Sequence, residues 1–289
     1  MKIAVASGKG GTGKTLIATH LAWALARAGE PVTYVDADVE APNGHLFLRP
    51  EIAEERPVSV AVPAMVRPTC AGCGDCARAC AFHAMLAAKD RVIVLPELCH
   101  SCGLCLEICP ERVLEERPRR LGVVCEGRAG PIRFLSGVLD VGEARATPLI
   151  SALASSLSAE GTTIIDAPPG TSCPAMEAVR AADLVVLVTE PTPFGLHDFE
   201  LAVQMCRALG KRAYAVLNRV GLGQTPMDEA FARHGTPLVA SIGFDAAISA
   251  ASAEGRMADE SSETLKKGLL ELLLRLGEDW QSLSPAVNP

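Results

Sequence analysis

The sequence predicts an α/β protein with a doubly wound, mostly parallel sheet and a second, small α+β domain inserted into it. Apolar strand-like runs alternate with helix-length segments along most of the 289 residues. A glycine-rich loop joins the first such run to the first helix, and eight of the eleven cysteines lie between Cys70 and Cys109. One α/β domain with a small module explains this length better than two equal domains.

The first element is the apolar run at 3–6, and a helical pattern covers 16–28. The loop between them matches a phosphate-binding loop and consists of Gly8, Lys9, Gly10, Gly11, Thr12, Gly13, Lys14 and Thr15. Glycines let backbone N–H groups close around phosphate oxygens, and the following helix adds its positive N-terminal end. We expect Lys14 to reach the β- and γ-phosphates of ATP and Thr15 to bind Mg²⁺.

Lys9 adds a second signal, because GKGGTGKT resembles the deviant Walker A motif of the MinD and ParA superfamily, which includes the iron protein of nitrogenase. The resemblance implies hydrolysis of ATP to ADP and phosphate, with Lys9 and Lys14 stabilising phosphate charge. It also implies an ATP-dependent homodimer, in which Lys9 reaches the phosphates bound by the partner subunit.

The second strand-like run, 31–35, ends in acidic residues. Such residues at the carboxyl end of a strand face the ligand crevice of a doubly wound fold. Asp38 stands where the family has its switch I aspartate, which implies a catalytic role in positioning the attacking water. Asp36 is the alternative candidate for this role, or it is a structural acid that caps the loop.

From residue 51 to 68 the α/β pattern is lost and proline is frequent, which predicts a domain boundary. We therefore expect a discontinuous ATPase domain, 1–62 and 115–289, with an inserted domain at 63–114. The charged stretch 111–120 is expected to be its exit linker.

The inserted segment carries two cysteine runs with the same spacing, and the spacing resembles that of bacterial two-cluster ferredoxins. In that family three cysteines of one run and the last cysteine of the other hold each 4Fe-4S cluster. The resemblance implies a first cluster on Cys70, Cys73, Cys76 and Cys109, and a second on Cys80, Cys99, Cys102 and Cys105. Zinc remains the competing interpretation. Ala81 departs from the family, which has a proline there, as Pro110 does in the second run.

The run 162–165 followed by Asp166 resembles a Walker B strand, and the residues after it resemble switch II. Asp166 is expected to hold Mg²⁺ through water, and Gly170 to approach the γ-phosphate. Cys173 stands where the nitrogenase iron protein has a cluster ligand, but its other ligand has no counterpart, because 137–145 contain no cysteine. A packing thiol, a transient ligand and an intersubunit metal or cluster ligand all remain open for Cys173.

Strands are expected at 184–189, 212–217 and 238–242, with a helix at 196–209. By resemblance, Asn218 is the adenine-contacting candidate, and Gly243 and Asp245 belong to a loop that covers the base. The terminal segment 265–276 has one apolar helical face, but its polar face is not strongly basic, so packing on the sheet is favoured over membrane binding.

Composition and charge argue against two classes of function. The net charge of −7, with no basic cluster, argues against nucleic-acid binding, and no apolar run approaches the roughly 20 residues that span a bilayer. We expect a cytoplasmic protein whose cysteines are metal ligands or core thiols.

Three functional hypotheses follow from these motifs. The first is an ATP-gated electron carrier that serves a redox partner through two 4Fe-4S clusters. The alternative is a maturation factor that delivers a cluster or metal to a partner metalloprotein. A positioning ATPase that acts on DNA or membrane is the third.

Overall fold

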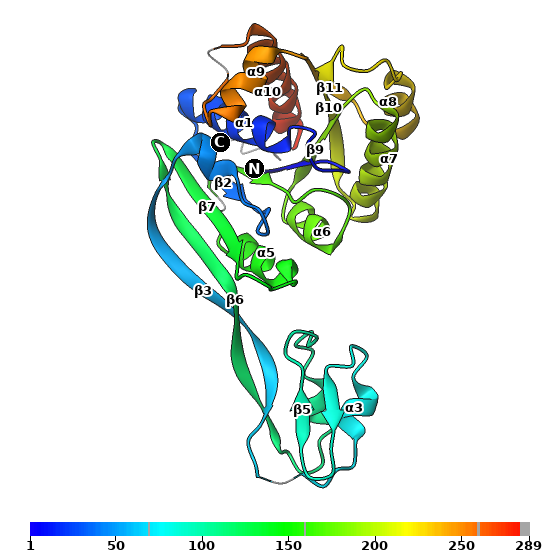
Figure 1. The fold of residues 1–289 in the computed structure, drawn as a ribbon. Helices are drawn as coiled ribbons and strands as arrows, with labels where there is room; N and C mark the ends of the chain where they lie inside the picture. Colours follow the sequence, from blue (N-terminus) through cyan, green and yellow to red (C-terminus); the bar gives the residue numbers. More distant parts are fainter. Residues whose placement is uncertain (69, 159, 259–260, 284–289) are drawn as a thin grey trace. The chain divides into compact units, whose positions relative to one another are not determined.

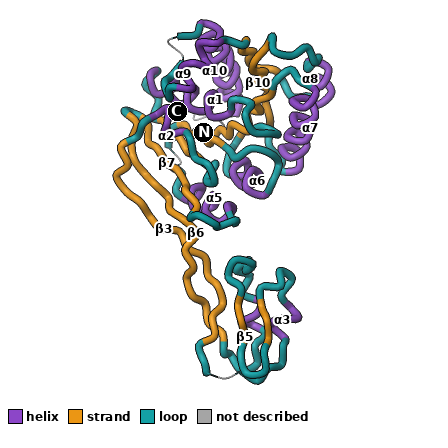
Figure 2. The backbone as a smooth tube through the Cα atoms, in the orientation of Figure 1, coloured by secondary structure: helices purple, strands orange, loops and turns teal. Residues whose placement is uncertain are grey.

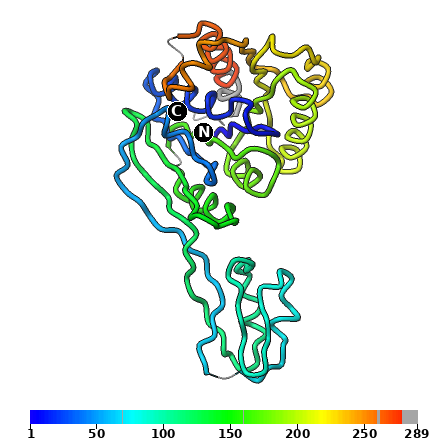
Figure 3. Tube along the Cα trace, viewed as in Figure 1, coloured from blue at the N-terminus to red at the C-terminus, as the bar shows by residue number. Residues whose placement is uncertain are grey.

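A computed structural model describes residues 1–68, 70–158, 160–258 and 261–283, except the side chains of 278–283. The chain divides into two compact units. Unit 1 comprises Met1–Glu55, Val124–Val138 and Ile150–Pro289, and unit 2 comprises Arg56–Val123 and Leu139–Leu149. Figure 3 shows that unit 1 is assembled from separate stretches of the chain, drawn in blue, in green and in yellow to red.

The described residues form one large sheet of nine strands in the order β11-β10-β9-β1-β8-β2-β7-β6-β3 (Figure 1). The strands are β1 (Lys2–Ala6), β2 (Val32–Asp36), β3 (Glu51–Met65), β6 (Leu114–Ala129), β7 (Ile132–Leu139), β8 (Thr162–Asp166), β9 (Leu184–Thr189), β10 (Arg212–Val220) and β11 (Leu238–Gly243). Every neighbouring pair from β11 to β7 is parallel, which confirms the predicted α/β class with a mostly parallel sheet.

The helices of the sheet domain alternate with its strands (Figure 2). They are α1 (Lys14–Arg27), α2 (Gly44–Leu48), α5 (Ala146–Ser155), α6 (Cys173–Arg180), α7 (Pro193–Ala208), α8 (Asp228–His234), α9 (Ala246–Ala253) and α10 (Glu263–Leu283). One hydrophobic core joins α1 and α10 to the central strands. Leu265, Leu269, Leu272 and Leu276 of α10 are buried in it, so the predicted packing of this helix is confirmed. No helix in the described part of the chain is both long and apolar enough to cross a membrane.

The predicted irregular boundary at 51–68 is wrong in its local structure, because residues 51–65 form the long strand β3. Val58, Val60 and Val62 alternate with other residues at the strand period of two. Pro57 and Pro63 hid this pattern, but β3 is the edge strand of the sheet, where a missing N–H group is tolerated. The expected exit linker at 111–120 likewise overlaps the start of β6.

Unit 2 contains two short helices, α3 (Asp75–Ala79) and α4 (Leu104–Glu107), which pack against each other. It also contains the antiparallel pair β4 (Met85–Ala87) and β5 (Val92–Val94). A small core of Cys76, Met85, Val92, Val113 and Leu114 holds these elements together, and several other cysteines pack on it.

Candidate functional site

The glycine-rich loop leaves β1 and enters α1 at Lys14, as the motif predicts. Gly11 and Gly13 have φ of 78° and 98°, in the left-handed region that favours glycine. Gly8 is required for a different reason, because a Cβ atom there would lie 2.0 Å from the carbonyl oxygen of Asp198 in α7. The backbone of this loop therefore depends on its glycines.

A cavity of about 460 Å³ lies against this loop. Of the residues predicted to contact nucleotide or Mg²⁺, those that line it are Gly10, Gly11, Gly13, Lys14, Thr15, Asp38, Asn218, Gly243 and Asp245. Gly8, Lys9, Thr12, Asp166 and Gly170 are not among its lining residues. The fold thus brings together segments more than 200 residues apart in the chain.

Two carboxylates, Asp36 and Asp166, are fully buried at the carboxyl ends of β2 and β8. Burial, together with the charge of Asp166, raises the pKa of Asp36 to about 8. Burial also raises the pKa of Asp166 to about 6, against the opposing effects of Thr15 and Lys14. Asp166 Oδ2 accepts a hydrogen bond of 3.0 Å from Tyr34, but its buried Oδ1 has no partner among the described residues. That orphaned oxygen fits a hydrated Mg²⁺ ion.

Asp36 and Asp38 occupy different positions. The Asp36 carboxylate accepts the backbone N–H groups of Asn43 and Gly44 at 3.0 and 2.8 Å, and so anchors the loop after β2. This arrangement matches the structural role left open for Asp36. Asp38 lines the cavity instead, and burial raises its pKa although Lys14 opposes the change.

The two loop lysines also differ. Lys14 is buried beside the carboxylates, and burial lowers its pKa while Asp166 and Asp38 act in the opposite direction. Lys9 is half-buried, and its Nζ lies 2.5 Å from Oε1 of Glu190. Arg219 reaches the other oxygen of Glu190 at 3.2 Å.

Asn218 and Asp245 make structural contacts in addition to lining the cavity. Asn218 Nδ2 donates to the carbonyl of Thr12 at 2.8 Å and so braces the phosphate-binding loop. The Asp245 carboxylate caps α9 by accepting from the N–H of Ala247, and it also accepts from the hydroxyl of Ser262.

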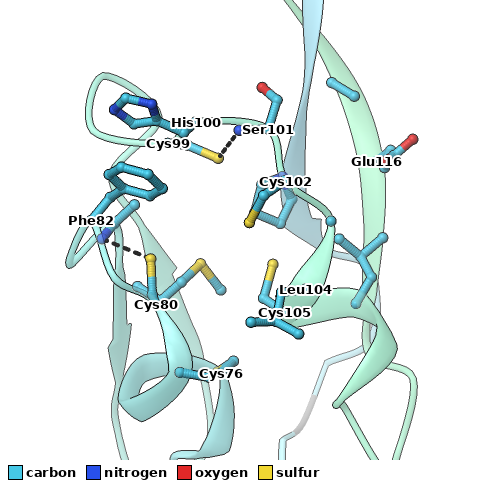
Figure 4. A pocket seen from close by; sticks show the side chains of 17 residues that line it. Cys76, Cys80, Phe82, Cys99, His100, Ser101, Cys102, Leu104, Cys105 and Glu116 are labelled. Carbon is cyan, nitrogen blue, oxygen red and sulfur yellow. Dashed lines mark hydrogen bonds between the residues drawn. The ribbon is translucent and has the colours of Figure 1, made fainter.

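The eight cysteines of the two runs lie in unit 2, and the two ligand sets expected from the sequence are named here as sites. Site 1 denotes Cys70, Cys73, Cys76 and Cys109, and site 2 denotes Cys80, Cys99, Cys102 and Cys105. Burial raises the pKa of Cys76, and the neighbours that add to the increase are Cys70, Cys109 and Cys73, the other members of site 1. Burial and then Cys99 and Cys102 raise the pKa of Cys105 to about 11, and Cys76 of site 1 adds to the increase. Figure 4 shows the sulfur atoms of site 2 around one space.

The backbone repeats with the cysteines, since each position of the second run follows its counterpart by 29 residues. Positive φ occurs at matched positions: Gly72 and Ser101, Gly74 and Gly103, His83 and Arg112. Backbone N–H groups donate to sulfur from Gly72 to Cys70, from Ala84 to Cys80 and from Ser101 to Cys99, at 3.3–3.4 Å.

Such N–H groups stabilise thiolate ligands, and strained non-glycine residues are typical of functional loops. Within the described residues, no group of three His, Cys, Asp or Glu side chains is placed to hold a single metal ion.

Residues 3–258 match the model of the CobQ/CobB/MinD/ParA nucleotide binding domain. The chain belongs to this family. An uncharacterized protein of Methanocaldococcus jannaschii is 30% identical over 227 residues, which are 77% of this chain and 79% of the relative. An iron-sulfur cluster carrier protein of Pseudomonas fragi is 47% identical over 60 residues, only 19% of this chain and 21% of the carrier.

Among solved structures, the septum site-determining protein MinD of Pyrococcus horikoshii, complexed with Mg-ADP, has a TM-score of 0.60. It is 20% identical, with 99% of each chain covered, and this likeness shows the fold.

Two features of this CobQ/CobB/MinD/ParA member were missed from the sequence. Glu190, which pairs with Lys9, follows a predicted strand, but a single acid there has no distinctive spacing. Tyr34 lies inside a strand, and its hydroxyl bond to Asp166 depends on the pairing of β2 with β8. Cys173 is exposed at the first position of α6, and no structural observation here assigns it a ligand.

Proposed function

We propose that this protein binds and hydrolyses ATP with Mg²⁺, holds two 4Fe-4S clusters at sites 1 and 2, and delivers an iron-sulfur cluster to a partner metalloprotein. The observation that carries the proposal is the gathering of cysteines from both runs around the small core of unit 2 and the cavity beside it, within a chain of the CobQ/CobB/MinD/ParA family. The local similarity to an iron-sulfur cluster carrier favours delivery as the role.

In the nucleotide site, each predicted residue has a role in binding or hydrolysis. Lys14 stabilises charge on the β- and γ-phosphates, and Thr15 and the orphaned oxygen of Asp166 hold Mg²⁺ directly and through water. Asp38, half-buried at the cavity, positions the attacking water. Gly170, with φ of 88°, lets the loop after β8 approach the γ-phosphate.

The iron-sulfur half depends on the donor set. Four thiolates per site, with backbone N–H groups aimed at sulfur, suit a 4Fe-4S cluster. When bound, such a cluster supplies one-electron redox chemistry or a transferable iron-sulfur unit. Four thiolates also suit zinc, so iron and acid-labile sulfide analysis of protein purified without oxygen is the first check.

Delivery is tested with anaerobically reconstituted protein and apo-aconitase as the acceptor. We expect recovery of aconitase activity to be faster with ATP and Mg²⁺ than with ADP. Lys14→Ala should lose hydrolysis and the ATP effect while keeping its iron, because the two sites use different segments. Equal recovery with ATP, ADP and no nucleotide would exclude nucleotide-driven delivery.

Cys173→Ser gives a separate control. If the delivered cluster leaves from unit 2, this variant keeps both the iron content and the transfer rate of the wild type. A loss of iron or transfer would instead assign the exposed thiol of Cys173 a part in holding the cargo.

Electron transfer is the second candidate, and the two complete sets of four cysteines favour it, because resident clusters need no open ligand position. A redox titration followed by electron paramagnetic resonance, with ATP or ADP, distinguishes the two. A nucleotide-dependent shift in a cluster potential, without transfer to apo-aconitase, would support the electron carrier.

A further inference from the structure

Sites 1 and 2 are built on the same sequence repeat, but the side chains that flank them differ. Two positions flank each site: the residue after the first ligand and the second residue after the fourth ligand. At site 1 these are Ala71 and Glu111, and at site 2 they are His100 and Phe82. In both sites the two flanking residues touch each other, so the comparison is between matched positions.

The two residues that flank site 2, Phe82 and His100, are aromatic. The rings of Phe82 and His100 stack with centroids 3.6 Å apart and an interplanar angle of 10°. Figure 4 shows the pair beside Cys80 and Cys99. At site 1 the exposed Glu111 carboxylate accepts the N–H of Ala71 at 3.0 Å instead. Aromatic rings keep water from the atoms that they pack against, whereas a carboxylate keeps its surroundings hydrated.

Site 2 is also enclosed from other directions. Cys99 is buried with Val62 and Ala84 in a small core, and Val60 and Cys80 pack against it. Ala61 and Pro63 line the same cavity as the cysteines of site 2, and Cys76 of site 1 also lines it. The first ligand of site 2, Cys99, is 8% exposed, whereas its counterpart in site 1, Cys70, is half-buried.

Arg145 holds the first ligand loop of site 2 in place. Its guanidinium donates to the carbonyl of Cys99 and is itself held by Glu143, with Nε 3.0 Å from Oε1. Arg119 contacts the other oxygen of Glu143, so the carboxylate lies between two arginines. The third ligands differ in the other direction, since Cys76 is buried and Cys105 is half-buried. The fourth ligands, Cys109 and Cys80, are both half-buried and pack on one small core, so the greater burial of site 2 lies at its first ligand.

We propose that the two sites have different tasks: site 2 retains its cluster beneath the Phe82–His100 stack, and site 1 is the exchangeable site from which the delivered cluster leaves. The proposal rests on the delivery function given above. Transfer is a ligand exchange without oxidation or reduction. The thiolates of site 1 give up the iron-sulfur unit to the cysteine thiols of the acceptor, and each of these thiols passes its proton to a vacated thiolate of site 1. A vacated thiolate without a matching acceptor thiol takes its proton from the solvent.

The test follows iron release from the anaerobic holoprotein into excess ferrozine, with the visible cluster absorbance as a second readout. We expect two phases of about equal amplitude, because each site holds the same number of irons. The double variant F82A/H100A should accelerate the slow phase by about tenfold and leave the fast phase unchanged. Glu111→Ala is the matched control at site 1, and it should leave the slow phase unchanged.

A second pair of variants assigns the phases without disturbing the aromatic stack. Cys109→Ser should affect the fast phase, and Cys80→Ser should affect the slow phase. Apo-aconitase with ATP should remove about half of the iron and leave the slowly released half.

One release phase, or acceleration of the fast phase by F82A/H100A, would overturn the proposal. Protein that binds no iron-sulfur cluster would instead overturn the proposed function itself.

Discussion

At the scale of single residues, Asp36 and Asp166 are two carboxylates buried at the carboxyl ends of neighbouring strands. They are direct partners in the register of β2 and β8, and burial raises the pKa of both. The unfolded chain loses these protons near pH 4, whereas the folded protein keeps them until about pH 6 for Asp166 and about pH 8 for Asp36. The native state therefore binds more protons in this range, and stability falls as pH rises.

The fall of stability with rising pH gives a prediction for protein free of Mg²⁺ and nucleotide. Its free energy of unfolding, measured with urea in EDTA, should fall between about pH 6 and pH 8, by on the order of 2 kcal/mol. Asp166→Asn, which keeps an acceptor for Tyr34, should flatten this dependence. Mg²⁺ with ADP should restore more stability at the higher pH, since the metal is held by the ionised carboxylate of Asp166. A stability that rises with pH in EDTA would contradict the assignment.

At the scale of elements, the loop between β1 and α1 shows how the fold constrains a motif. Neither Gly8 nor Gly10 has a positive φ, so the two differ mainly in the space available to a Cβ atom. A Cβ at Gly8 would collide with the backbone of Asp198, whereas one at Gly10 would lie 3.9 Å from Pro169.

Gly8→Ala should therefore destabilise the protein by about 1–3 kcal/mol or more, as overpacking against backbone does. Gly10→Ala is the control, with an expected change below about 1 kcal/mol. Both values come from urea unfolding without nucleotide, so that contacts with phosphate do not contribute. Equal destabilisation by the two substitutions would show that crowding at Asp198 is not the cause.

The elements also show how far the sequence alone leads. The order of strands and helices around the glycine loop was predictable, because hydrophobic periodicity and glycine spacing are local signals. The strand β3 was not, since proline suits a strand only at an edge and edge position depends on the whole sheet.

Contacts between distant segments could not be predicted from the sequence either. The approach of Glu190 to Lys9 and of Phe82 to His100 has no signature in sequence spacing. The cysteine repeat was readable, but the difference in cover between its two halves required the structure.

At the scale of the whole molecule, the resemblance to the MinD and ParA superfamily implies an ATP-dependent homodimer in which Lys9 reaches a partner's phosphates. Within one chain, however, Lys9 is paired with Glu190, which Arg219 also contacts. Dimer formation then includes breaking this ion pair. Because the Lys9 side chain is 30% exposed, the pair contributes only about 0.5–1 kcal/mol.

Glu190→Gln should lower this cost and tighten the ATP-bound dimer by about five- to thirtyfold, because a symmetric dimer breaks two such ion pairs and each 1.4 kcal/mol is a factor of ten in affinity. Sedimentation velocity with Mg²⁺ and a non-hydrolysable ATP analogue measures the change. Lys9→Ala is the matched variant. If Lys9 reaches the partner's phosphates, this variant should weaken the dimer although it also removes the ion pair. If Lys9→Ala and Glu190→Gln both strengthened the dimer, the ion pair would be the whole effect and Lys9 would have no role in the partner's site.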